Sequence, residues 1–180
     1  MNEDAPLILT LLMDDASQMR FDRLREAHFP PGRNYLRAHL TLFHKLPAER
    51  VTDIREDLRE VCGGREPFTL TTTGVRFLGQ GVAYELSSPE MLSLRKELAV
   101  RWGPWLGEQD RQGFRPHVTV QNKVSPEDAR TLHERLRASF SPFEVGGDGL
   151  SLWRYLGGPW EPTGTYPFGM PSGSAKPQPL

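Results

Sequence analysis

A six-residue segment of this sequence occurs in two similar copies, and this repetition limits the possible folds more than any other feature. Residues 37–42 read RAHLTL and residues 115–120 read RPHVTV, and an amphipathic segment follows each copy. Pro67-Phe68 and Pro142-Phe143 then open two β-rich stretches. Internal similarity of this kind predicts a chain built from two related halves, each contributing one copy of the segment.

Three segments carry the signals of capped amphipathic helices. Ser88-Pro89-Glu90 and Ser125-Pro126-Glu127 each place a capping serine before a proline and an acidic residue, the order preferred at helix N-termini. A third segment follows Pro47, and Gly63-Gly64 ends it. Apolar residues recur at helical spacing in all three, at Met91, Leu94 and Leu98, at Ala129, Leu132 and Leu136, and at Val51, Ile54, Leu58 and Val61. We expect a further helix between residues 17 and 27.

The β-rich runs between these helices predict strands over residues 7–13, 39–43, 68–77, 82–86, 117–121 and 150–155, with turns at Gly79 and Gly157. Strands that alternate with helices and hairpins predict an α+β fold. We expect a bilobal arrangement with pseudo-two-fold symmetry, in which two antiparallel sheets face a central cleft and helices cover their outer faces. We expect residues 1–168 to form this domain and residues 169–180, rich in Pro, Gly and Ser, to be a flexible tail.

The composition excludes several classes of protein. A net charge of −1 provides no broad basic surface, so we do not expect a protein that coats long nucleic acids. Cys62 is the only cysteine, which excludes an internal disulfide and fits a cytoplasmic protein. The apolar run over residues 7–13 is too short to cross a bilayer and follows acidic residues. We therefore expect a strand there rather than a signal peptide or a membrane anchor.

Both copies of the repeated segment place a histidine and a threonine on one face of a strand. Successive side chains of a strand alternate between faces, so His39 and Thr41 point into the cleft together, as do His117 and Thr119. One imidazole can accept a proton while the other donates one near neutral pH, and threonine hydroxyls can donate hydrogen bonds to phosphate oxygens. The pattern suits in-line displacement at phosphorus without a metal.

The two tetrads HLTL, from residue 39, and HVTV, from residue 117, resemble the HxTx motifs of the 2H phosphoesterase superfamily. Their surroundings, HLTLFHKLP and FRPHVTVQNKV, are similar to its bacterial 2′-5′ RNA ligase-like, or 2′,3′-cyclic phosphodiesterase, branch. The resemblance extends over residues 7–168. It implies a bilobal α+β fold and an enzyme that opens 2′,3′-cyclic phosphates or handles 2′-5′ linkages of RNA or nucleotides without a cofactor.

The resemblance also implies roles for the motif residues. His39 would donate a proton to the leaving oxygen and His117 would accept one from the attacking water, while the phosphate would be held by Thr41 and Thr119. Several members of the branch carry an arginine soon after the second motif, where this chain has Gln121-Asn122-Lys123. The lysine offers a point charge but not the bidentate fork of an arginine, so the preferred substrate stays open.

Residues around the motifs are further candidates for substrate contacts. Arg37 and Arg115 precede the two histidines by two positions, and they lie either on the cleft face, where they bind substrate phosphates, or at its solvated rim. We expect His44 to alternate away from the cleft. Three aromatic side chains either stack on a base or pack in the core: Tyr84, Trp153 and Tyr155.

The sequence favours an enzyme over two other classes of protein. Both histidine–threonine pairs are intact, and no short His-x-x-x-His spacing indicates a zinc site, so we expect a metal-independent phosphoesterase. One alternative is a protein that binds a nucleotide or an RNA end in the same cleft without turnover. The other is an interaction surface built around exposed aromatic residues. We expect a monomer without membrane contact or an obligate protein partner.

Overall fold

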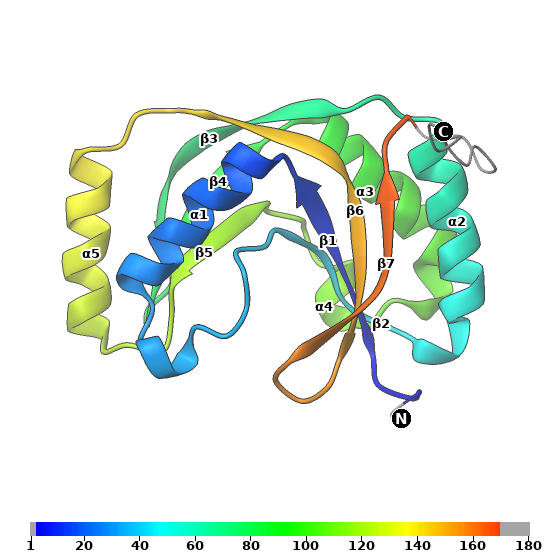
Figure 1. The fold of residues 1–180 in the computed structure, drawn as a ribbon, viewed down its shortest axis with the longest axis horizontal. Coiled ribbons are helices and arrows are strands. Elements are labelled where there is room, and N and C mark those ends of the chain that lie inside the picture. The colour runs from blue at the N-terminus through cyan, green and yellow to red at the C-terminus, as the bar shows by residue number, and fades with distance from the viewer. Residues whose placement is uncertain (1–2, 170–180) are drawn as a thin grey trace, which may run out of the picture.

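The computed structural model describes residues 3–169, which form an α+β fold (Figure 1). The seven strands of this part of the chain are β1 (Leu7–Met13), β2 (Thr41–Leu46), β3 (Phe68–Phe77), β4 (Val82–Ser87), β5 (His117–Gln121), β6 (Glu144–Tyr155) and β7 (Trp160–Pro167). The helices are α1 (Asp15–His28), α2 (Val51–Gly63), α3 (Pro89–Trp102), α4 (Glu108–Arg111) and α5 (Pro126–Ala138). Strand β7 and helix α4 were not predicted from the sequence.

The helix starts follow the capping signals of the sequence. Ser88 Oγ accepts a hydrogen bond from the backbone N–H of Met91 at 3.2 Å, at the start of α3. Ser125 caps α5 in the same way. Helix α1 begins before the predicted residue 17, because the Asp14 carboxylate accepts from the backbone N–H of Ser17 at 2.9 Å. Each of these side chains satisfies an N–H group that the helix leaves unpaired.

The strands form one antiparallel sheet, and the prediction of two separate sheets is wrong in this respect. The strand order is β2-β1-β6-β3-β4-β5, with β7 paired to β6. Residues 68–71 of β3 pair with residues 144–147 of β6, and this short ladder joins the two parts of the sheet. It exists because β3 and β6 are longer than their neighbours, and Figure 1 shows them crossing the top of the molecule.

The order of elements along the chain repeats itself. The first run is β1, α1, β2, α2, β3, and the second is β4, α3, β5, α5, β6, with α4 inserted between α3 and β5. If each strand is exchanged for its counterpart in the other run (β1 for β4, β2 for β5 and β3 for β6), the strand order of the sheet is the same read from its other end. The motif strands β2 and β5 lie at the two ends of this order. Gly79 and Gly157, the predicted turn residues, have positive φ angles of 88° and 87°. These features support two related halves, and their superposition in space stays a prediction.

Helices cover the sheet in two groups. Helices α1 and α5 pack near β3, β4 and β5, whereas α2 and α3 lie on the other side of the molecule (Figure 1). Most of the apolar residues predicted at helical spacing are buried in the hydrophobic core, including Ile54, Leu58, Met91, Leu94 and Leu98. The periodicity of the sequence therefore identified the faces that pack against the sheet.

Two buried arginines connect the halves. Arg25 of α1, in the first run, donates a hydrogen bond to the Thr119 carbonyl of β5 at 3.3 Å. Arg95 of α3, in the second run, donates to the Leu42 carbonyl of β2 at 2.7 Å and to the Asp110 carbonyl at 2.6 Å. Each half therefore supports the motif strand of the other half.

No helix within residues 3–169 is long and apolar enough to span a membrane. The predicted flexible tail over residues 169–180 lies outside the described residues, apart from Gly169. The backbone N–H of Gly169 donates to the carbonyl of Cys62 at 3.2 Å. The domain boundary at residue 168 stays a prediction.

Replacing Arg95 by alanine removes the donor from the carbonyls of Leu42 and Asp110. Because an unsatisfied buried polar group costs about 1–3 kcal/mol, we expect the Arg95→Ala variant to lose roughly 3 kcal/mol of unfolding free energy. Urea-induced unfolding measures this loss. Arg23→Ala, at an exposed position of α1, is the matched control and should change stability by less than about 0.5 kcal/mol. Equal losses in both variants would contradict the supporting role of Arg95.

Candidate active site

The four motif side chains line one cavity of about 220 Å³. His117 and Thr119 lie on one face of β5, and the intervening Val118 is buried on the other face. His39 lies just before β2 and Thr41 opens that strand. The lining of the cavity consists of Ile8, His39, Thr41, His44, His117, Thr119 and Trp160. Two segments far apart in the sequence thus bring two imidazoles and two hydroxyls together.

Both motif imidazoles are held in the same way by the backbone. His39 Nδ1 lies 2.8 Å from the carbonyl oxygen of Arg37, and His117 Nδ1 lies 3.0 Å from that of Arg115. Because a carbonyl oxygen only accepts hydrogen bonds, Nδ1 is the protonated nitrogen of each ring. Nε2 of each ring is therefore the nitrogen available for proton transfer within the cavity.

The surroundings favour the neutral form of both rings. Burial lowers the pKa of His39 to about 4, the hydrogen bond to the Arg37 carbonyl opposes this change, and the charge of Arg25 adds to it. Burial also lowers the pKa of His117, and the charge of Arg76 acts in the same direction. Neutral imidazoles are proton acceptors near pH 7, and an anionic substrate beside them favours proton uptake.

The prediction that His44 points away from the cleft is wrong. Thr41 pairs with Thr10 and Phe43 pairs with Leu9, so one extra residue, Leu42, lies between these two pairs and forms a β-bulge. The bulge shifts the alternation, and Leu42 and Phe43 are both buried. His44 therefore returns to the side of Thr41 and lines the cavity. The prediction assumed that side chains alternate without interruption along this strand. The burial of two consecutive residues, Leu42 and Phe43, breaks that alternation.

An aromatic wall borders the cavity beside His39. The ring of Trp160, on β7, lies 4.5 Å from that of His39 between centroids. Trp153 on β6 is 6.1 Å from Trp160, and its Nε1 donates to Thr10 Oγ1 at 2.9 Å. An adjoining cavity of about 360 Å³ shares His39 and Trp160 with the first and is also lined by Trp153. The sequence analysis identified Trp153 but missed Trp160, because Pro162 and Gly164 interrupt the β pattern of this strand.

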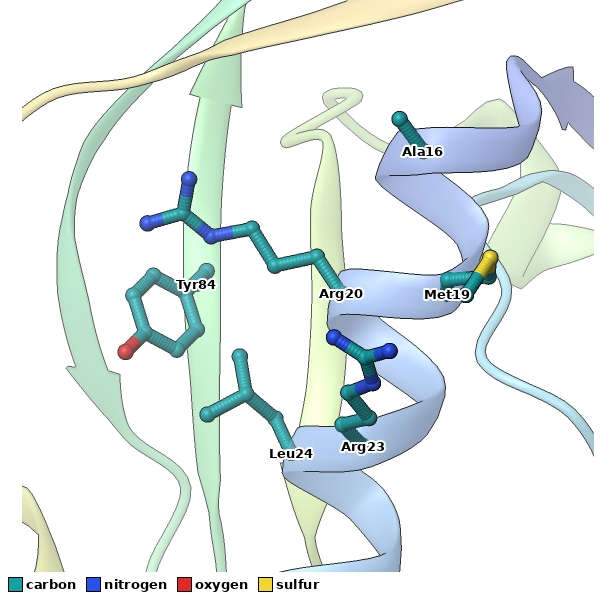
Figure 2. Close-up of a pocket in the computed structure, with 6 residues that line it drawn as sticks. All are labelled: Ala16, Met19, Arg20, Arg23, Leu24 and Tyr84. Carbon is teal, nitrogen blue, oxygen red and sulfur yellow. The ribbon is translucent and has the colours of Figure 1, made fainter.

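The other two aromatic candidates lie elsewhere. Tyr84 of β4 pairs with Val118, so its side chain points away from the face of His117. Its ring is buried against Phe21 and Phe143. Figure 2 shows it opposite α1, and with residues of that helix it lines a separate cavity. The volume of this cavity is about 600 Å³. Tyr155 is 40% exposed near the end of β6 and lines neither cavity beside His39.

Charged side chains lie around the cavity rather than inside it. Arg37 and Arg115 are exposed and form ion pairs of 2.8 Å with Asp22 and Glu85. Arg37 lines the adjoining cavity, whereas Arg115 lines neither of the two. Arg76, which the sequence analysis missed, lies 3.7 Å from Glu85 and its charge acts on His117. Charged side chains therefore lie near both histidines, with Arg37 and Asp22 on the His39 side and Arg76, Arg115 and Glu85 on the His117 side.

Two further sequence features have a place in the structure. Lys123 is exposed in the turn after β5, with a φ angle of 62°, and does not line the cavity. The hairpin predicted at Gly79 connects β3 and β4. Among residues 3–169, no group of three or more His, Cys, Asp or Glu side chains has the arrangement of a metal site.

Comparison with known proteins agrees with this geometry. A sequence model described as the 2′-5′ RNA ligase superfamily matches residues 13–159. The chain belongs to this superfamily, a group of 2H phosphoesterases. The matched segment contains both motifs and most of the sheet. Comparison with curated protein sequences gives no significant match.

Solved structures show the same fold at low sequence identity. TT0787 of Thermus thermophilus is 15% identical, with a TM-score of 0.66 over 92% of this chain and 98% of the other. E. coli LigT, crystallised with 3′-AMP, is 18% identical, with a TM-score of 0.56 over 92% and 98% of the two chains. LigT with NADP⁺ gives 16% identity and a TM-score of 0.56 over 93% and 99%. The fold shared with these structures thus spans nearly the whole of the chain.

The pKa of His39 predicts a pH dependence of stability. The unfolded chain binds a proton at this residue near the ordinary pKa of 6.5, whereas the folded protein binds it near pH 4. The unfolded state therefore binds more protons between these values, and the unfolding free energy should fall as the pH decreases from about 6.5 to about 4. We expect a smaller decrease in the His39→Gln variant, measured by urea unfolding at several pH values. Identical pH dependence in both proteins would contradict the burial of a neutral His39.

Proposed function

We propose that this protein is a phosphoesterase that opens 2′,3′-cyclic phosphates or acts on 2′-5′ linkages of nucleotides or RNA ends. The observation that carries the proposal is the cavity in which two imidazoles, each with a free Nε2, accompany two threonine hydroxyls. Superfamily membership supports a phosphoesterase with an RNA-related substrate. The nucleotides bound to LigT support a nucleotide partner for this chain.

The geometry suits an in-line displacement. His117 Nε2 takes a proton from water, and the water oxygen forms a bond to phosphorus. The bond from phosphorus to the 3′-oxygen breaks, and His39 Nε2 gives that oxygen its proton, leaving a 2′-phosphate and a 3′-hydroxyl. The hydroxyls of Thr41 and Thr119 donate hydrogen bonds to the non-bridging oxygens, where negative charge concentrates in the transition state.

The donor role requires that His39 gains a proton before the reaction. In the free protein His39 is neutral near pH 7, because its pKa lies at about 4. A bound phosphate supplies an adjacent negative charge that favours the protonated ring. Substrate binding and proton uptake are therefore coupled in this site, and the alkaline limb of the kcat profile depends on the pKa of His39 in the enzyme–substrate complex.

The aromatic wall is suited to hold a base. Trp160 borders the cavity of the motif residues, and Trp153 continues into the adjoining one. A nucleoside whose phosphate lies between the two imidazoles can extend along these rings, since every base offers a π-face to an aromatic side chain. The adjoining cavity is thus the proposed nucleoside site.

The His39→Ala and His117→Ala variants test the proposal directly. General acid–base catalysis contributes about 10²–10⁴-fold, so each variant should lose at least roughly 10²-fold in kcat on a 2′,3′-cyclic nucleotide in the presence of EDTA. Chromatographic separation of the 2′- and 3′-phosphate products measures the reaction. Tyr155→Ala, exposed and outside the cavity, is the control and should retain wild-type activity.

Two outcomes would contradict the proposal. Full activity in either histidine variant would remove the acid–base pair from the mechanism. A wild-type protein that binds 2′,3′-cyclic nucleotides but leaves them intact, whichever base they carry, would instead support the alternative, a protein that holds a nucleotide or RNA end without turnover.

Trp160 tests the proposed nucleoside site. Base stacking on an aromatic side chain is worth about 1–3 kcal/mol, so the Trp160→Ala variant should show a roughly tenfold higher KM for a cyclic nucleotide. Ribose 2′,3′-cyclic phosphate, which lacks a base, is the control substrate, and its KM should change little. Equal changes in KM for both substrates would show that Trp160 acts on His39 and not on the base.

A further inference from the structure

His44 adds a third imidazole to the cavity of the motif residues. Its side chain is 42% exposed, and its Nδ1 lies 3.3 Å from Oδ1 of Asp110, whose side chain is 2% exposed. Since a carboxylate accepts the Nδ1 proton, Nε2 is left for other partners. The ring thus has the same free nitrogen as the two motif histidines but is held by a charged group.

Asp110 is fixed by contacts with the edge of the sheet. Strand β2 ends the sheet, and its outward N–H groups have no neighbouring strand. The Asp110 carboxylate accepts hydrogen bonds from the backbone N–H groups of His44 at 2.8 Å and Lys45 at 2.9 Å. Burial raises the pKa of this carboxyl, but the hydrogen bonds from His44 and Lys45 outweigh that effect and keep the pKa below its usual range. Asp110 is therefore an anion beside the His44 ring.

The lining of the cavity contains no lysine or arginine. A phosphate that enters it needs a positive partner, and the three imidazoles are the only lining groups that can become cations. His39 and His117 are held in their neutral forms by burial. The charge of His44 contributes to lowering the pKa of both, which places it within electrostatic reach of each. Only His44 has a carboxylate at hydrogen-bond distance to balance its charge.

We propose that His44 is a substrate-binding residue that donates a hydrogen bond from Nε2 to the phosphate, with Asp110 as its positioning residue and counter-ion. This assignment deepens the proposed function and rests on it for the identity of the substrate. The groups that act on the His44 ring are Asp110 from α4, His39 before β2 and His117 from β5. Phosphate binding should consequently depend on the His44 ring and on the carboxylate beside it.

The His44→Gln variant tests the assignment through binding. A hydrogen bond to a charged group is worth about 1.5–3 kcal/mol, so the dissociation constant for a nucleoside 2′-monophosphate should rise roughly tenfold to a hundredfold at pH 6. The increase in affinity from pH 8 to pH 6 should also become smaller in the variant. Isothermal titration calorimetry measures both effects. Lys45→Ala removes a formal charge from the next, exposed residue and is the matched control, with unchanged affinity expected.

Asp110→Asn tests the positioning role. The amide cannot accept from both backbone N–H groups, so unfolding in urea first establishes that the variant is folded. The folded variant should bind the monophosphate more weakly and lose the pH dependence of binding, whereas a purely structural carboxylate would leave the pH dependence unchanged.

Measurements of binding and of turnover distinguish a failure of this inference from a failure of the proposed function. If wild type and His44→Gln bind the monophosphate equally, the role of His44 is wrong, whatever the activity of the enzyme. If His44→Gln binds it more weakly but wild type hydrolyses no cyclic nucleotide, the proposed reaction is wrong and the phosphate site stands. NMR titration with inorganic phosphate gives an independent check, because the His44 ring signals should shift in wild type, and their failure to move would overturn the assignment.

Discussion

Arg25 and Arg95 hold the candidate site together, because each reaches from a helix of one half to the motif strand of the other. Burial lowers the pKa of both guanidinium groups, while the charges of Asp22 and Asp110 oppose the change. A buried arginine needs all its partners, since an unpaired charge inside a protein is costly. The carbonyls of Thr119 and Leu42 are therefore fixed in position, and with them the strands from which the motif side chains project.

The two motifs on these strands are alike, but their surroundings differ. Each motif histidine is anchored through Nδ1 to a backbone carbonyl two residues earlier, which leaves Nε2 for proton transfer. Beside His39 lie the rings of Trp153 and Trp160. Beside His117 lie the charges of Arg76, Arg115 and Glu85. Charged side chains thus lie near both motif histidines, and the two sides of the cavity differ in the tryptophan rings beside His39.

The sequence predicted the structural features that depend on short-range order along the chain. The capping serines, the apolar helix faces and the alternation of His117, Val118 and Thr119 follow from short-range rules, and the structure agrees with them. The face of His44 could not be predicted, because it depends on a bulge that only the register of β1 against β2 reveals. Trp160 lies in a strand whose proline and glycine hide its β pattern, and the ladder between β3 and β6 depends on pairing across the whole chain.

The contacts of α1 and α3 with the motif strand of the other half also bear on how the two sides of the cavity can differ. Two identical chains, each lending its helix to the other, would build the same crossed contacts with a two-fold axis. In such a pair every substitution occurs twice, so a tryptophan beside one histidine would stand beside both. A single chain that carries both halves is free of this constraint. It can place tryptophan rings beside one histidine and not beside the other while both imidazoles keep their positions.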